Sequence, residues 1–94
     1  MTDLRAYARN QPCQVRLPGI CNHNAETTVL AHFRLIGITG LGFKSKSDLI
    51  GSWACSDCHS YVDTHHDDAT QLAFAQGVFR TQYFLLEEGV ITNV

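Results

Sequence analysis

Apolar positions recur with a helical period over the last third of the chain. One stripe repeats at about 3.6 residues per turn and consists of Leu72, Ala75, Phe79, Tyr83 and Leu86. A second stripe, roughly opposite, consists of Phe74, Val78 and Leu85. The pattern predicts one long helix over about residues 67–88. We expect both stripes to be covered, the second by the N-terminal segment or by another copy of the chain, so a homodimer through this helix is one expectation.

Shorter elements are expected before this helix. Segments rich in β-formers alternate with turn-forming segments, and they predict strands over 14–17, 27–35 and 49–54. A short helix is expected near the start, with Thr2 as its N-cap, and a second helix begins in "SDCHSYVD". The glycine-rich segment 37–48 is expected to be a loop. Short strands mixed with helices in this way predict an α+β fold.

The size and composition of the chain limit its class. With 94 residues, 45% of them hydrophobic and 17% charged, the chain should fold as a single domain, 1–94, rather than stay disordered. A domain this small often needs a metal ion or disulfides besides its core. No run of about 18 apolar residues predicts a membrane span, and the first ten residues lack the apolar stretch of a signal peptide. We therefore expect a cytoplasmic protein without a membrane partner.

The formal net charge is −2, but the charges are unevenly distributed. Residues 1–46 carry six Lys and Arg side chains against two carboxylates, whereas residues 47–94 carry one Arg against seven carboxylates. A basic first half can meet phosphates, and an acidic second half can hold divalent cations. Charges scattered over a solvated surface are the simpler alternative.

The four cysteines form two well-separated pairs. Cys13 and Cys21 bracket a Pro-Gly turn, and Cys55 and Cys58 form a Cys-x-x-Cys ahead of a helix. Four thiolates from two tight turns suit tetrahedral zinc, which would supply much of the folding energy. Reducing conditions disfavour disulfides, and a redox-active Cys-x-x-Cys is disfavoured because the chain lacks a thioredoxin-like pattern. We therefore expect one structural zinc ion on these cysteines.

A second cation is suggested by the residues that follow Cys58. His59 points about 100° away from that cysteine around the helix, so it does not easily join the same zinc. Asp63 lies four residues later on the same helical face, where an imidazole and a carboxylate can share a divalent cation. A first-turn histidine beside a solvated aspartate, without metal, is the alternative. The roles of His65 and His66 stay open.

A further histidine lies in the segment expected to form the central strand. Alternation along "TTVLAHFRL" places His32 and Arg34 on the same side of that strand. A single histidine in a strand is more often structural. Here the neighbouring guanidinium makes this side of the strand suitable for holding a phosphate.

The order of these motifs resembles the HNH, or ββα-metal, nucleases in their zinc-stapled, treble-clef form. In that family a cysteine pair precedes a strand ending in the general-base histidine, a loop follows, and a second Cys-x-x-Cys-His opens the metal-binding helix. Here the same order covers about residues 13–63, as Cys13 and Cys21, "VLAHFR", the glycine-rich loop and "CSDCH". More narrowly, the whole chain resembles the YbcO family of small lambdoid prophage proteins, which are regarded as nucleases.

The resemblance implies a role for each matching residue. His32 matches the general base, His59 the first metal-binding histidine of the helix, and Asp63 the second helix ligand. Asp48 falls near the asparagine that orients the base, after a gap two residues longer than usual. Ala31 stands where many members carry a metal-binding aspartate.

The activity implied is that of a metal-dependent DNA endonuclease of phage or prophage origin in a bacterial host cell. It would use structural Zn²⁺ together with catalytic Mg²⁺ or another divalent cation, and Arg34 could hold the phosphate. Two alternatives stay open: a catalytically silent treble-clef module that binds nucleic acid, and a zinc-stapled protein-interaction module. The set of His32, His59 and Asp63 favours the nuclease, because a binding module does not need it. Ala31 and the displaced Asp48 favour a silent module.

Overall fold

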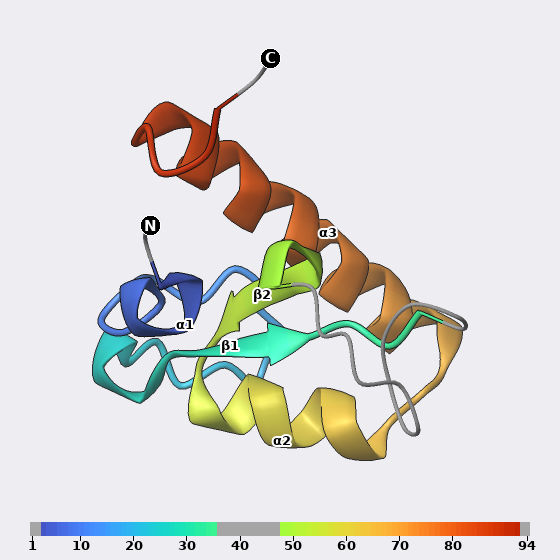
Figure 1. Cartoon of the computed structure of the whole chain (residues 1–94). Helices are drawn as coiled ribbons and strands as arrows, with labels where there is room; N and C mark the ends of the chain where they lie inside the picture. The colour runs from blue at the N-terminus through green and yellow to red at the C-terminus, as the bar shows by residue number, and fades with distance from the viewer. Residues whose placement is uncertain (1–2, 36–47, 93–94) are drawn as a thin grey trace.

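The structure is a computed structural model that describes residues 3–35 and 48–92. In chain order, its elements are α1 (Leu4–Tyr7), η1 (Ala25–Thr27), β1 (Val29–His32), η2 (Asp48–Ile50), β2 (Gly51–Ala54), α2 (Ser56–Thr64) and α3 (Asp68–Glu87). Figure 1 shows α2 below the two strands and α3 above them. The small α+β fold expected from the sequence is confirmed. Most of the predicted loop 37–48 lies outside the described residues.

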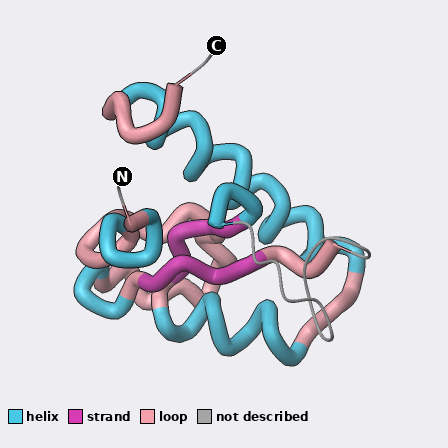
Figure 2. Tube along the Cα trace, in the orientation of Figure 1, coloured by secondary structure: helices cyan, strands magenta, loops and turns pink. Residues whose placement is uncertain are grey.

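The two strands form an antiparallel pair, drawn in magenta in Figure 2. Their register places Val29 opposite Ala54 and His32 opposite Gly51. All four residues of β2 are buried, because α3 packs against this strand and α2 lies at its end. The order β1, β2, α2 puts His32 at the end of one strand and "CSDCH" at the end of the other. This is the ββα arrangement that the motif order predicted.

The long helix α3 approaches β2 closely at a glycine. A Cβ atom added to Gly77 would lie 2.6 Å from the Ser52 hydroxyl and 3.1 Å from the carbonyl oxygen of Gln14. One turn later, the buried hydroxyl of Thr81 accepts a hydrogen bond from the backbone N–H of Trp53 (3.0 Å) and donates to the carbonyl of Gly77 (2.8 Å). Small and hydroxylated residues therefore fix the helix on the strand.

Within the described residues α3 buries one of its two apolar stripes, and cover of the other by another copy of the chain stays a prediction. The stripe of Phe74, Val78 and Leu85 is buried, whereas the other stripe exposes Leu72 (59%), Phe79 (68%), Tyr83 (57%) and Leu86 (39%). The reason is that the sheet has room for one face of the helix. The helix packs on the sheet through the side that carries Gly77 and Thr81. Neither residue is large and apolar, so the apolar pattern does not identify this side. The expected contact with the N-terminal segment is present, because Leu85 packs with Ala8 and Trp53.

Two smaller expectations are wrong. Residues 14–17 form no strand, because the chain must bend for Cys13 and Cys21 to meet; Arg16 adopts a left-handed conformation there (φ 55°). The side chains of Val15 and Leu17 are buried beside the cysteines instead of pairing in a sheet. The N-cap of α1 is Asp3, which accepts hydrogen bonds from the backbone N–H groups of the first turn, while the predicted cap, Thr2, lies outside the described residues.

Candidate functional site

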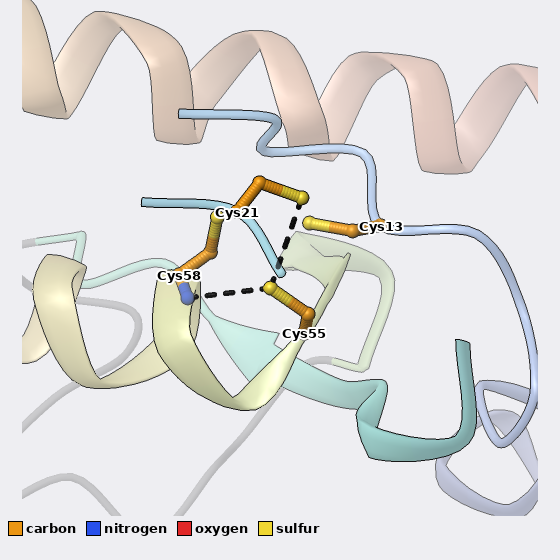
Figure 3. A group of neighbouring side chains, drawn as sticks. All are labelled: Cys13, Cys21, Cys55 and Cys58. Carbon is orange, nitrogen blue, oxygen red and sulfur yellow. Dashed lines mark hydrogen bonds between the residues drawn. The ribbon is translucent and has the colours of Figure 1, made fainter. Parts of the chain in front are cut away.

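The four cysteines converge on one point between the segment before β1 and the start of α2 (Figure 3). Their sulfur atoms all lie within 4.8 Å of one another, and the Sγ atoms of Cys21 and Cys55 are 3.8 Å apart. Tetrahedral zinc with Zn–S bonds of about 2.3 Å separates its sulfurs by about 3.8 Å. None of the four forms a disulfide. The donor set and its spacing therefore fit a metal ion such as zinc, as the sequence predicted.

Local turns bring these sulfurs together. Gly19 adopts a left-handed conformation (φ +75°), and the backbone N–H of Cys21 donates to the carbonyl of Leu17 (2.9 Å), which closes the first turn. In the second pair, Cys55 is the N-cap of α2, and its sulfur accepts a hydrogen bond from the backbone N–H of Cys58 (3.4 Å). Each pair thus points both of its sulfurs inward.

Burial makes two of these cysteines, Cys58 and Cys21, poor acids without a cation. Burial raises the pKa of the Cys58 thiol far above its usual range, and it also raises the pKa of Cys21. At Cys55 burial acts in the same direction, but hydrogen bonds from the backbone of Cys58 and Asn22 bring the pKa below the ordinary value. A bound cation would stabilise all four as thiolates, because zinc binds the deprotonated sulfur.

The predicted base and its predicted partner lie together at the edge of the sheet. Nε2 of His32, the last residue of β1, is 2.7 Å from Oδ1 of Asp48, the first residue of η2. The same carboxylate oxygen is 3.6 Å from Nε of Arg5 on α1. The side chains of His32 and Asp48 are 24% and 31% exposed, so solvent reaches both. No motif pointed to Arg5, since it lies 27 residues before His32 and outside the matched segment.

The second predicted pair lies on the exposed face of α2. Nε2 of His59 is 3.5 Å from Oδ2 of Asp63, and the two side chains are 40% and 50% exposed. A divalent ion bound at about 2.1 Å to both atoms would separate them by about 3 to 3.5 Å. The pair can therefore offer two ligands to one cation and leave its other positions open. In the described part of the chain, the cysteines form the one cluster of three or more potential metal ligands.

The remaining candidates are Arg34, His65 and His66, and their side chains make other contacts or lie in solvent. Arg34 is exposed two residues beyond the end of β1, so the strand alternation that was expected to align it with His32 stops before it. The ring of His65 stacks on that of Tyr61, with centroids 3.8 Å apart. Nε2 of His66 lies 3.2 Å from the carbonyl oxygen of Asp63, near the end of α2. Both of these histidines contact the end of their own helix.

Comparisons with known proteins agree over nearly the whole chain. A family model described as "Putative nuclease YbcO" matches residues 2–90. The protein named "Putative nuclease YbcO" from Escherichia coli (strain K12) is 52% identical over 95 residues, covering 97% of this chain and 98% of that protein. "Putative nuclease ybcO" from Enterobacteria phage 82 matches to the same extent.

A solved structure supports the same assignment. It is titled "Structure of a putative bacteriophage protein from Escherichia coli str. K-12 substr. MG1655" and is 44% identical to this chain, with a TM-score of 0.73. The match covers 93% of this chain and 100% of the other. None of the helices in the described residues is long and apolar enough to cross a membrane. From its sequence and its fold, the chain belongs to the YbcO family.

Proposed function

We propose that this protein is a metal-dependent DNA endonuclease of the HNH type, acting in the cytoplasm of a bacterial host. The proposal depends chiefly on the hydrogen bond between His32 and Asp48 (2.7 Å) at the end of β1, beside a helix that pairs His59 with Asp63. The contact between β1 and α2 keeps the two pairs in one ββα unit. The descriptions of the family and of both relatives as nucleases support the same class of activity.

His32 has the environment of a general base. An ionised carboxylate only accepts hydrogen bonds, so its contact with Asp48 assigns the ring proton to Nε2 and leaves the lone pair on Nδ1. Nδ1 would then take a proton from the water that attacks the phosphodiester phosphorus. Asp48 fixes the tautomer and the ring, and it stabilises the imidazolium that forms. Arg5, at 3.6 Å, helps to hold the carboxylate in place.

His59 and Asp63 would hold the catalytic divalent cation, for example Mg²⁺. When bound, that cation would supply positive charge that stabilises the negative charge developing on the phosphate in the transition state. Two protein ligands on an exposed helical face leave room for water and for substrate, which a catalytic site requires. Arg34, exposed beyond the end of β1, would contact a neighbouring phosphate.

One observation favours a second candidate, a catalytically silent module that binds nucleic acid. Ala31, in the position where many HNH proteins carry a metal-binding aspartate, is 1% exposed and belongs to the core. Its position therefore cannot supply a ligand, and the cation would rest on two side chains. The nuclease remains the better-supported proposal, because a silent module has no need of the His32–Asp48 pair.

A plasmid-nicking assay tests the proposal directly. Wild-type protein should convert supercoiled DNA to nicked or linear forms with Mg²⁺ or Mn²⁺ and not with EDTA. His32→Ala should lose at least about 10²-fold in rate, the usual scale for a general base, while it keeps its zinc. Asp57→Ala, which removes another exposed carboxylate of α2, is the control and should cut at the wild-type rate. Wild-type protein that binds DNA but cuts with neither cation would favour the silent module.

A further inference from the structure

The stripe of α3 stays largely exposed in the described part of the chain, although the ring of Tyr83 contacts that of its neighbour Phe84 (centroids 5.4 Å). Its large apolar members, Leu72, Phe79, Tyr83 and Leu86, are between 39% and 68% exposed. Two aromatic side chains and two leucines exposed to this extent present about 400 Å² of surface, at the size where apolar patches usually mark an interaction site. The stripe is therefore more than a few scattered surface residues.

Charge is almost absent from this face. Between residues 69 and 86 the one charged side chain is Arg80, and its guanidinium donates to the carbonyl oxygen of Gln14 (2.6 Å). The helix instead carries acidic residues at both ends, Asp67 and Asp68 at its start and Glu87 and Glu88 at its end. Aromatic residues without charges are typical of the centre of a protein–protein interface. Nucleic acid and anionic lipid are both disfavoured, because neither would meet a cation here.

The spacing of the stripe identifies the partner. Successive members of the stripe, Leu72, Ala75, Phe79, Tyr83 and Leu86, are separated by three, four, four and three residues. This spacing is the same in both directions from Phe79. Two antiparallel copies of α3 related by a two-fold axis at Phe79 would therefore place Leu72 opposite Leu86 and the small Ala75 opposite the large Tyr83. A two-fold interface needs this kind of self-complementary patch.

We propose that the protein forms a symmetric dimer through the exposed stripe of α3, with the two helices antiparallel. Two such faces supply about 800 Å² of apolar surface, and their polar neighbours bring the total near the lower end of specific interfaces, about 1,200 Å². The dimer should therefore be weak, with micromolar dissociation. The pairing also brings the acidic ends of the two helices together, so it should tighten as salt rises. This proposal is independent of the nuclease activity.

Sedimentation of the protein without DNA tests the interface. Wild-type protein should shift from monomer to dimer with concentration, and Phe79→Glu should weaken the association by at least about tenfold. Ser60→Glu, which adds the same charge at an exposed position of α2, is the control and should behave as wild type. A wild-type monomer at about 1 mM, or a dimer insensitive to Phe79→Glu, would overturn the proposal.

The antiparallel register has its own test. Leu72→Lys and Leu86→Glu should each weaken the dimer, because each places unpaired charges in an apolar interface. The double variant should recover at least part of the loss, since Lys and Glu would face each other across the two-fold axis. Thermal unfolding would confirm that each variant is folded. Without recovery in the double variant the antiparallel register is wrong.

Discussion

The cysteine cluster and the two histidine–aspartate pairs belong to the same ββα unit but are built in opposite ways. The cysteines are closed in: Cys55 and Cys58 are fully buried, and four sulfurs surround one point. The pairs are open, since His32 and Asp48 are about a quarter to a third exposed and His59 and Asp63 are nearly half exposed. A closed tetrahedral site holds a structure together, whereas a reactive site keeps positions open for substrate.

Changes at the closed site and at the open site should therefore be separable. A substitution among the cysteines, or in the core that they share with Phe74 and Val78, acts on folding. If the proposed roles hold, a substitution in the exposed pairs should act on the chemistry and leave the fold intact. The following predictions test this separation.

The largest effect is expected from Cys55→Ser. The change removes a sulfur ligand and the sulfur that accepts a hydrogen bond from the backbone N–H of Cys58. Because the metal site and the core form together, the variant should lose its zinc and unfold. Elemental analysis and circular dichroism would measure both losses. A folded Cys55→Ser protein without metal would show that the cluster is dispensable.

His59→Ala should abolish cleavage without unfolding the protein. It removes one of two proposed ligands of the catalytic cation, so the cleavage rate should fall at least about 10²-fold, with the zinc content and the melting temperature unchanged. Single-turnover cleavage measured beside thermal unfolding would separate the two effects. A fall in melting temperature that matches the loss of activity would instead assign His59 a structural role.

Thr81→Val should lower the stability of the protein without lowering its cleavage rate. The backbone N–H of Trp53 would lose its buried acceptor, which costs about 1–3 kcal/mol in the free energy of unfolding. The cleavage rate should not change at temperatures where the variant is folded, since the hydroxyl of Thr81 bonds to Trp53 and Gly77 and to neither pair. Urea unfolding is the measurement. An unchanged free energy of unfolding would contradict the role assigned to this hydroxyl.

Asp48→Asn should have the smallest effect. An asparagine can still accept a hydrogen bond from Nε2 of His32 through its amide oxygen, but it no longer stabilises the imidazolium by charge. We expect a loss of up to about tenfold in cleavage rate for Asp48→Asn and a larger loss for Asp48→Ala. Equal losses in the two variants would indicate that Asp48 does not orient His32.

The candidate pairs could be located from the sequence because the motifs that contain them are local, whereas their roles stay a prediction. Cys-x-x-Cys-His fixes three positions within one helical turn, and the i, i+4 spacing places His59 beside Asp63. The pairing of Asp48 with His32 depended on the family resemblance, since the gap to the next motif is irregular. Arg5 could not be found, because its contact with Asp48 depends on how α1 docks on the rest of the fold.

The packing of α3 could be predicted only in part. Helical periodicity gave nearly the whole length of the helix, but it could not decide which stripe faces the sheet. The buried face of the helix carries Gly77 and Thr81. Gly77 lets the helix approach β2 closely, and Thr81 accepts a hydrogen bond from it, so neither residue adds to the apolar pattern. The β-propensity of residues 14–17 predicts a strand, but propensity is local and does not include the requirement that Cys13 and Cys21 meet.

The most direct test of two sites with separate roles is Mn²⁺ binding to zinc-loaded protein, followed by electron paramagnetic resonance alongside elemental analysis. We expect one zinc per chain in wild type, His59→Ala and Asp63→Ala alike. We also expect one bound Mn²⁺ in wild type and weakened or absent Mn²⁺ binding in both variants. Asp57→Ala should bind Mn²⁺ as wild type does. If wild type binds no Mn²⁺, or if both variants bind it as tightly as wild type, the assignment of the second cation to His59 and Asp63 is contradicted.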